Sequence, residues 1–176
     1  QAKQYFAERK LPDSIIQRYQ LGYAPAGYGF MQRCFGAEPQ TLNQLESIGV
    51  VIKNERGGAD RFRDRVIFPI RDKQGKTVGF GGRIIGKGEP KYLNSPETDF
   101  YHKSNLLYGF SEHREHIRKE KMLVVVEGYM DVLAMAAFGL PYALAPLGTA
   151  ITEQQLTNIL RLYGEPIFCF DGDRAG

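Results

Sequence analysis

Short apolar segments alternate with amphipathic helical segments over the last third of the chain, and this alternation restricts the fold more than any other feature. The apolar segments have the length and residue types of buried strands. Strands that alternate with helices form right-handed βαβ units, so a parallel α/β sheet is predicted for residues 121–176. The strands are predicted at Leu123–Val126, Tyr142–Ala145 and Ile167–Phe170, and the helices at Gly128–Phe138 and from Thr152, where Gln155 completes a capping box.

Three carboxylates directly follow two of these strands. Glu127 follows the first strand, and Asp171 and Asp173 follow the last. Ligands collect beyond the carboxyl ends of parallel strands, and carboxylates that share this edge repel each other unless a cation lies between them. Oxygen ligands of this kind suit Mg²⁺ or Mn²⁺. Because Gly128 lets a phosphate approach the N-terminus of the next helix, a metal site shared with a nucleotide or nucleic-acid phosphate is predicted.

Two other interpretations of the acidic residues stay open. Residues 171–176 (Asp-Gly-Asp-Arg-Ala-Gly) are similar to the opening of a calcium-binding loop, although Ala175 takes a ligand position and an apolar strand precedes it. Asp131 lies one turn after Glu127, where a carboxylate either joins the metal site or caps its own helix.

The first 120 residues have a mixed pattern of helices and strands. We therefore predict the fold class α/β (α+β), with a basic N-terminal subdomain over residues 1–120 followed by the parallel α/β subdomain over residues 121–176. Helices are predicted at Ala2–Lys10, from Pro12 and at Pro39–Ile48, a turn at Gly27–Phe30, a loop at Asn54–Asp60, and strands at Leu21–Pro25, Arg63–Arg71 and Lys76–Ile85, the last two joined as a hairpin.

Three arginines alternate along the start of this hairpin. Period two in a strand would place Arg61, Arg63 and Arg65 on one face. A solvated strand face and a phosphate-binding track both agree with this pattern, because guanidinium groups donate in pairs to phosphate oxygens.

Two further motifs follow. Gly79-Phe80-Gly81-Gly82-Arg83 lies inside the second strand of the hairpin, where repeated glycine indicates either a bend or the close approach of a ligand or another backbone. Lys91-Tyr92-Leu93-Asn94-Ser95 combines a cation, an aromatic ring and small hydrogen-bonding side chains, a mixture that suits single-stranded nucleic acid.

The charge distribution agrees with a polyanion held next to a cation site. Residues 1–120 carry 20 Lys and Arg against 14 Asp and Glu, whereas residues 121–176 carry 3 against 6. Cys34 and Cys169 are predicted to pack as small apolar residues, and His113 and His116 to lie on a solvated helix face. With no apolar stretch of membrane-spanning length and no leader, a cytoplasmic location without membrane contact is expected, and the start at Gln1 indicates a fragment.

Six ordered motifs resemble one family. A strand that ends in Glu-Gly, then a second strand, then one that ends in Asp-x-Asp, resembles the TOPRIM fold. The longer motifs resemble the catalytic core of DnaG-type bacterial primases over nearly the whole chain. These motifs are DRFRDRVIFPI at Asp60–Ile70, GFGGR at Gly79–Arg83, PKYLNSPET at Pro90–Thr98, LYGF at Leu107–Phe110, VVEGYMDV at Val125–Val132 and CFDGDRAG at Cys169–Gly176.

The resemblance implies roles for particular residues. It makes Glu127, Asp171 and Asp173 catalytic metal ligands of Mg²⁺ or Mn²⁺, with Asp131 nearby. It also implies that template or nucleotide is held by a basic surface beside that site, which comprises Arg83, Lys91, Tyr92 and Lys103, with Arg61, Arg63 and Arg65 less directly matched.

The implied activity is the synthesis of short RNA primers on single-stranded DNA by metal-dependent nucleotidyl transfer at the replication fork. The implied substrates are single-stranded DNA template and ribonucleoside triphosphates, and the implied form is a monomer. The family's zinc-binding domain, its regions for the replicative helicase and single-strand-binding protein, and its third acidic motif have no match in this sequence.

Two functions from other classes stay open at this point. One is a nucleic-acid-binding module whose TOPRIM half is structural, as in some recombination proteins. The other is topoisomerase-type strand cleavage by a tyrosine, with Glu127 as proton carrier. Nothing in the sequence marks any of the ten tyrosines as that nucleophile.

Overall fold

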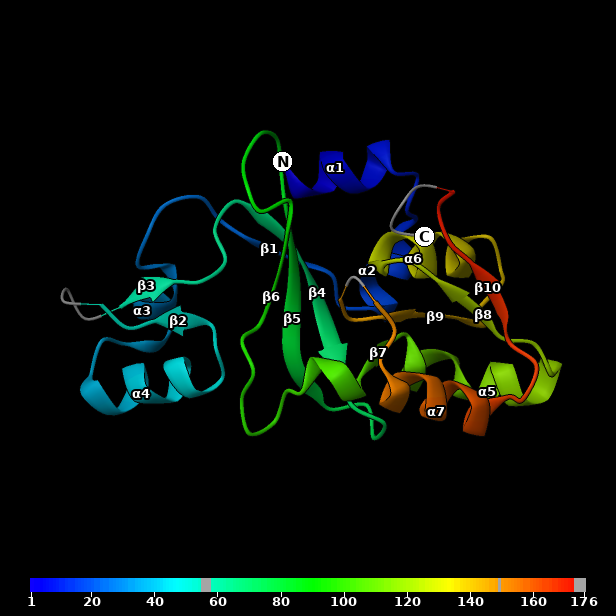
Figure 1. Cartoon of the computed structure of the whole chain (residues 1–176). Helices are drawn as coiled ribbons and strands as arrows, with labels where there is room; N and C mark the ends of the chain where they lie inside the picture. Colours follow the sequence, from blue (N-terminus) through cyan, green and yellow to red (C-terminus); the bar gives the residue numbers. More distant parts are fainter. Residues whose placement is uncertain (55–57, 149, 173–176) are drawn as a thin grey trace. The chain divides into compact units, whose positions relative to one another are not determined.

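The chain divides into two compact units by its internal contacts. The computed structural model (Figure 1) describes residues 1–54, 58–148 and 150–172. One unit comprises residues 1–10, 16–70 and 78–101, and the other comprises residues 11–15, 71–77 and 102–176. The predicted subdomain boundary at residue 121 stays a prediction. Within the described residues, no helix has both the length and the apolar character that crossing a membrane requires.

A four-stranded sheet forms the centre of the first unit. Its strands lie in the order β1-β4-β5-β6. The predicted hairpin is confirmed, because β4 and β5 are neighbours and the Asp72 carboxylate between them accepts hydrogen bonds from the backbone amides of Gln74 and Lys76, both at 2.9 Å. The strands are β1 (Gly22–Ala24), β4 (Arg65–Arg71), β5 (Thr77–Ile84) and β6 (Tyr92–Asn94).

Besides β1, the described residues before β4 in the chain form four short helices and a small two-stranded sheet. The predicted helices are confirmed as α1 (Ala2–Glu8), α2 (Asp13–Arg18) and α4 (Pro39–Ser47). Helix α3 (Phe30–Phe35) was not predicted. Part of the predicted loop at Asn54–Asp60 is instead a strand, β3 (Ala59–Asp60), which pairs antiparallel with β2 (Val51–Ile52), and residues 55–57 lie outside the described part.

The glycines of the GFGGR motif make room for aromatic side chains. A Cβ added at Gly79 would lie 2.5 Å from Cδ2 of Tyr101, whose side chain is fully buried. A Cβ added at Gly82 would lie 2.7 Å from Cδ1 of Phe62. Both distances are shorter than real carbon contacts, so the strand needs glycine at these positions for packing within the first unit.

The second unit contains the predicted parallel sheet. Its strands lie in the order β10-β8-β9-β7. Strand β8 pairs parallel with both β10 and β9, and the edge strand β7 pairs antiparallel with β9. Figure 1 shows α6 on one face of this sheet and α5 and α7 on the other. The elements are the 3-10 helix η1 (Lys103–Asn105), β7 (Leu107–Tyr108), α5 (Phe110–Glu120), β8 (Val124–Val126), α6 (Tyr129–Ala137), β9 (Ala143–Pro146), α7 (Glu153–Leu162) and β10 (Ile167–Cys169).

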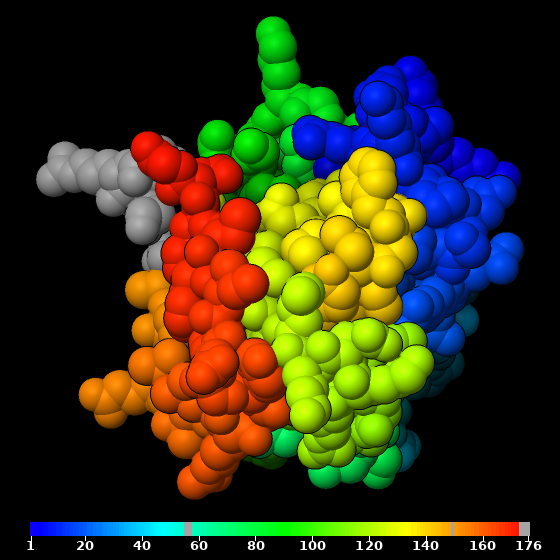
Figure 2. All heavy atoms as spheres, turned by 90° about the vertical axis from the view of Figure 1, so that its right-hand side faces the viewer, coloured from blue at the N-terminus to red at the C-terminus, as the bar shows by residue number. Residues whose placement is uncertain are grey.

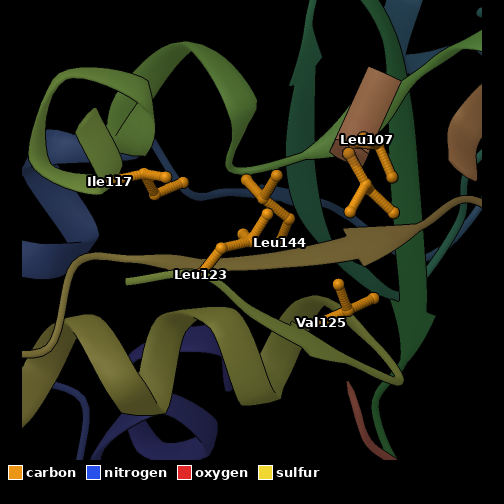
Figure 3. Close-up of a cluster of buried hydrophobic side chains, with 6 residues drawn as sticks. Leu107, Ile117, Leu123, Val125 and Leu144 are labelled. Atoms are coloured by element: carbon orange, nitrogen blue, oxygen red, sulfur yellow. The ribbon is translucent and has the colours of Figure 1, made fainter. Parts of the chain in front are cut away.

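An apolar cluster joins this sheet to α5 and α7. Its members are all at most 3% exposed, and several are shown in Figure 3. The buried cluster consists of Leu107, Ile117, Leu123, Val125, Leu144 and Ile159.

The capping box predicted at the start of α7 is also present, because Thr152 Oγ1 accepts from the Gln155 amide at 3.1 Å and Gln155 Oε1 accepts from the Thr152 amide at 3.0 Å.

The prediction that both cysteines pack inside is wrong. Cys169 is exposed because β10 is the edge strand of its sheet, and Figure 2 shows the C-terminal segment, in red, at the surface. Cys34 is exposed as well, on a six-residue helix that buries none of its side chains. Apolar residue type alone therefore did not decide burial here.

The prediction of a solvated face for both histidines is wrong for His113. Its side chain is fully buried, and Nδ1 lies 2.7 Å from the carbonyl oxygen of Ala143 in β9. This hydrogen bond compensates the burial of the imidazole. His116 is exposed, as predicted.

Candidate metal site and nucleic-acid interface

Glu127 and Asp171 follow neighbouring strands of the second unit and are joined by a hydrogen bond. In the parallel pair β8–β10, Val126 lies opposite Cys169, so the chain leaves both strands at the same edge of the sheet. The backbone amide of Asp171 donates to Glu127 Oε2 at 3.3 Å, and both side chains are exposed. The structure thus brings together two of the predicted acidic residues at the carboxyl edge of a parallel sheet.

Asp131 serves as a cap for α6. Its Oδ2 accepts a hydrogen bond from the Gly128 amide at 3.0 Å, which is one half of a capping box. The other half is missing because Gly128 has no side chain. The structure therefore supports the capping interpretation of Asp131, and its second carboxylate oxygen is not used by this bond.

The acidic edge offers oxygen donors of the type that divalent cations bind. Asp173 lies outside the described residues. Among the residues that are described, no group of three or more His, Cys, Asp or Glu side chains has the arrangement of a metal site. Two carboxylates on adjacent strand ends, next to a helix whose N-cap residue is glycine, fit the chemistry of a hard cation that also binds phosphate.

Arg83 lies between two aromatic rings in the first unit. Its guanidinium carbon is 4.8 Å from the ring centroid of Tyr5 and 5.9 Å from that of Tyr92. Tyr92 is opposite Arg83 in the β5–β6 pair, which explains this contact. Burial raises the pKa of the Tyr5 phenol, and the positive charge of Arg83 opposes that change. Two rings therefore orient the Arg83 guanidinium group, and of these two only Tyr92 was predicted to belong to the same surface.

Helix α1 contributes residues that were predicted only as packing. The Arg9 guanidinium carbon lies 5.5 Å from the Tyr5 ring centroid. Arg9, Tyr5 and Arg83 line an open cavity of about 330 Å³ in the first unit. The spacing of Tyr5 and Arg9, one helical turn apart, was the signal for this pair, but nothing in the sequence connected it to Arg83.

Lys91 and Lys103 belong to different units. Lys91 is exposed immediately before β6, and Glu89 Oε2 accepts from its amide at 3.2 Å. Lys103 is exposed in η1 of the second unit, where its carbonyl oxygen accepts from Gln155 Nε2 at 3.0 Å. Only Lys91 thus shares a unit with Arg83 and Tyr92.

The prediction that three arginines share one strand face is wrong. β4 begins at Arg65, and Asp64 has a positive φ of 49°, so residues 61–64 are not in a strand. Arg65 is 5% exposed and donates to the carbonyl oxygens of residues 82, 90 and 91. Arg61 donates twice to the carbonyl oxygen of residue 94. Burial lowers the pKa of both guanidinium groups, whose hydrogen bonds hold the strands together.

The sequence has close relatives among known proteins. Residues 1–114 match the family model of the DNA primase catalytic core, N-terminal domain, and residues 121–176 match that of the Toprim domain. DNA primase of Escherichia coli (strain K12) is 46% identical over 176 residues, which cover 99% of this chain and 30% of that protein. DNA primase of Haemophilus influenzae is 48% identical over 177 residues, which cover 100% and 30%. The chain thus spans 30% of the length of these curated relatives.

Solved structures agree with this similarity. The DnaG primase catalytic domain bound to single-stranded DNA has a TM-score of 0.92 and 46% identity, with 99% of this chain and 55% of that chain covered. A DNA primase domain from Pseudomonas aeruginosa has a TM-score of 0.93 and 44% identity, with 99% and 55% covered. The RNA polymerase domain of Mycobacterium tuberculosis primase, in complex with a DNA duplex that has a 6-nucleotide overhang, has a TM-score of 0.90 and 36% identity, with 99% and 58% covered.

Proposed function

The chain belongs to the family of DnaG-type primase catalytic cores, and from this we propose that it is part of an enzyme that makes RNA primers on single-stranded DNA. The observation that carries the proposal is the carboxylate pair at Glu127 and Asp171, on adjacent parallel strand ends, in a chain whose other unit bears an aromatic-supported cation at Arg83. The second unit offers carboxylate ligands to a cation, and the first unit offers a positively charged contact to a polyanion.

The proposed reaction is nucleotidyl transfer. The 3′-hydroxyl group of a primer loses its proton to solvent, and its oxygen bonds to the α-phosphorus of a ribonucleoside triphosphate. The bond from that phosphorus to the oxygen bridging to the β-phosphate breaks, and pyrophosphate leaves. Bound Mg²⁺ or Mn²⁺ would neutralise phosphate charge and favour the attacking alkoxide. Glu127, Asp171 and Asp173 are the residues proposed to hold it.

The role of the carboxylate pair is to fix negative charge at one place. The Asp171 amide donates to Glu127, so the backbone of one strand end orients the carboxylate of the other. Such preorganisation lowers the activation free energy, because the charged groups do not have to be reoriented during the reaction. Asp131 fixes the start of α6 and thereby the loop that carries Glu127.

The role of the first unit is to hold single-stranded template by its backbone. Arg83 is kept in place by Tyr5 and Tyr92, and Lys91 is an exposed point charge next to them. Contacts of this type give affinity that falls with salt and carry little sequence information. Arg65 serves the fold in this proposal, because its donors are used on carbonyl oxygens.

Removing cations from this surface tests the template-binding role. In the 176-residue chain, Arg83→Ala and Lys91→Ala are each expected to weaken binding to an oligothymidylate several-fold and to lower the slope of log affinity against log salt concentration by roughly 0.7 per lost phosphate contact. Fluorescence anisotropy at several salt concentrations measures both quantities.

Lys53→Ala is the matched control, because Lys53 is exposed in the same unit and next to β2. If both test variants bind as the unchanged chain does at every salt concentration, the template-binding surface is assigned wrongly.

Template-directed incorporation of labelled ribonucleotides tests the whole proposal. A full-length protein that carries this chain is expected to extend primers on single-stranded DNA with Mg²⁺ or Mn²⁺ and to stop when the metal is chelated. Incorporation that needs neither template nor divalent cation would contradict the proposal. The replicative helicase and single-strand-binding protein as partners, the monomeric state and the cytoplasmic location stay predictions.

A further inference from the structure

Helix α7 buries amide side chains and exposes leucines. Gln155 is fully buried and Asn158 is 5% exposed, whereas Leu156 and Leu160 on the same helix are 38% and 46% exposed. Hydrophobic burial alone would favour the reverse, because buried amides need hydrogen-bond partners and exposed leucines gain nothing. The two amides are therefore buried because of the contacts that they make.

These contacts are hydrogen bonds to consecutive backbone carbonyl oxygens of η1 and the residue after it. Gln155 Nε2 donates to two of them at 3.0 and 2.9 Å, Asn158 Nδ2 donates to a third at 3.2 Å, and the Thr152 hydroxyl donates to the fourth at 2.6 Å. The acceptors, in the same order, are the carbonyl oxygens of Lys103, Leu106, Asn105 and Ser104. A 3-10 helix of three residues has few internal hydrogen bonds, so the donors of α7 fix its position.

Asn158 is itself oriented by the hairpin between β4 and β5. Lys73 Nζ donates to Asn158 Oδ1 at 2.9 Å, so both ends of the amide are used. The Arg114 guanidinium group on α5 donates to the Lys73 carbonyl oxygen at 2.6 Å. All of these residues belong to the second unit, and the amide that supports η1 is thus held from two sides.

The sheet register places η1 at the edge that carries the acidic residues. Leu107, the first residue of β7, lies opposite Pro146, the last residue of β9. Because β9 runs parallel to β8, the start of β7 shares the edge at which Glu127 follows β8. Only β9 separates β7 from β8, which corresponds to about 10 Å at the usual strand spacing. The exposed residue Lys103, just before β7, therefore lies on the same edge as the proposed metal ligands.

We propose that Gln155 and Asn158 are positioning residues for nucleotidyl transfer, which hold η1 so that the Lys103 ammonium group contacts the outer phosphates of the ribonucleoside triphosphate. The inference rests on the proposed function, because a metal held by Glu127 and Asp171 would bind the same triphosphate. The incoming nucleotide is favoured over the template as the source of the phosphate, since the template is assigned to the other unit.

The kinetics of ribonucleotide incorporation by a full-length protein that carries this chain test the positioning role. A contact with an outer phosphate is present before and during the reaction, so Lys103→Ala is expected to raise KM for ribonucleotide about 10-fold and to leave kcat within about 3-fold. Gln155→Met keeps the length of the side chain but removes both donors, and is expected to raise KM at least about 5-fold. Asn158→Asp keeps the acceptor for Lys73 but loses the donor to η1, and is expected to raise KM at least about 3-fold.

A double variant distinguishes positioning from a purely structural role. In a Lys103→Ala background, Gln155→Met is expected to raise KM by less than about 2-fold, because the cation that it displaces is gone. Gln154→Met, which changes the exposed glutamine one position earlier, is the matched control and is expected to leave KM unchanged. Partial unfolding of a variant lowers the apparent kcat but does not change KM. An equal rise in KM for Gln155→Met with and without Lys103, or a fall in kcat alone for Gln155→Met and Asn158→Asp, would overturn the inference.

Two further results separate this inference from the proposed function. Binding of an oligothymidylate to the 176-residue chain is expected to stay within about 2-fold in Lys103→Ala and Gln155→Met, because the template is held by cations of the first unit. A larger loss of this affinity with an unchanged KM would assign the phosphate to the template, and the inference would be wrong while the proposed function stands. If the unchanged full-length protein incorporates no ribonucleotide on single-stranded DNA, the inference and the proposed function are both wrong.

Discussion

Glu127→Gln is expected to lower template-directed ribonucleotide incorporation by at least about 100-fold in a full-length protein that carries this chain, the size of effect that follows removal of one preorganised charge-stabilising group. Gln retains an oxygen that can accept the hydrogen bond from the Asp171 amide, so the geometry of the strand ends is kept while the negative charge is lost. The loss is therefore expected in the turnover rate and in the response to metal concentration, and incorporation assays over a range of Mg²⁺ concentrations measure both.

Two further measurements serve as controls for this experiment. One is the DNA binding of Glu127→Gln, and the other is ribonucleotide incorporation by a matched acidic variant, Glu165→Gln. Glu127→Gln is expected to bind single-stranded DNA within about 2-fold of the unchanged protein, because backbone phosphates are held by Lys and Arg. Glu165→Gln removes an exposed carboxylate two residues before β10 and is expected to leave incorporation unchanged. Incorporation by Glu127→Gln at more than a tenth of the normal rate would remove Glu127 from the proposed metal site.

Gly79→Ala is expected to lower the free energy of unfolding by about 1–3 kcal/mol, the usual cost of an added methyl group in a packed interior. The new Cβ would lie 2.5 Å from the fully buried ring of Tyr101. Replacing glycine by alanine also restricts the unfolded chain, which stabilises by about 0.4–1 kcal/mol, but the overlap with the ring is the larger effect. Thermal or urea unfolding of the 176-residue chain measures the change.

Two comparisons show whether crowding is the cause. Gly164→Ala has no heavy atom within 4 Å of the added Cβ and is expected to change the free energy of unfolding by at most about 1 kcal/mol, in the stabilising direction. In a Tyr101→Leu background, Gly79→Ala is expected to cost at least about 1 kcal/mol less than in the unchanged chain, because the smaller side chain leaves room. An equal cost in both backgrounds would show that contact with Tyr101 is not the reason for glycine at this position.

Periodicity and chain order were sufficient to predict the parallel sheet of the second unit. The segments that form β8, β9 and β10 were recognised because each is short and apolar and because helix signals follow the first two, and these features are local. The edge strand β7 was missed, since two residues carry no periodicity. The same reasoning placed Glu127 and Asp171 at one edge, and the strand register agrees with it.

Local patterns were a poor guide where the chain departs from regular structure. Alternation over Arg61, Arg63 and Arg65 indicated a strand face, but Asp64 adopts a left-handed conformation and the pattern ends there. The glycines of the GFGGR motif indicated a bend or a close approach. The structure shows that aromatic side chains of the same unit make that approach, a distinction that requires the partner Tyr101 to be known.

The sequence by itself indicated the family through the resemblance of its ordered motifs. It also determined the order of the main elements and the acidic strand ends, because hydrophobic period, helix caps and strand termini are set by neighbouring residues. Only the tertiary structure decided which cations are used inside the fold and which are presented to a ligand. Arg65 is enclosed by carbonyl oxygens, whereas Arg83 is supported by Tyr5 and Tyr92, and the two arginines look alike in the sequence. The difference depends on contacts between residues distant along the chain, which form only when the strands and α1 of the first unit pack together.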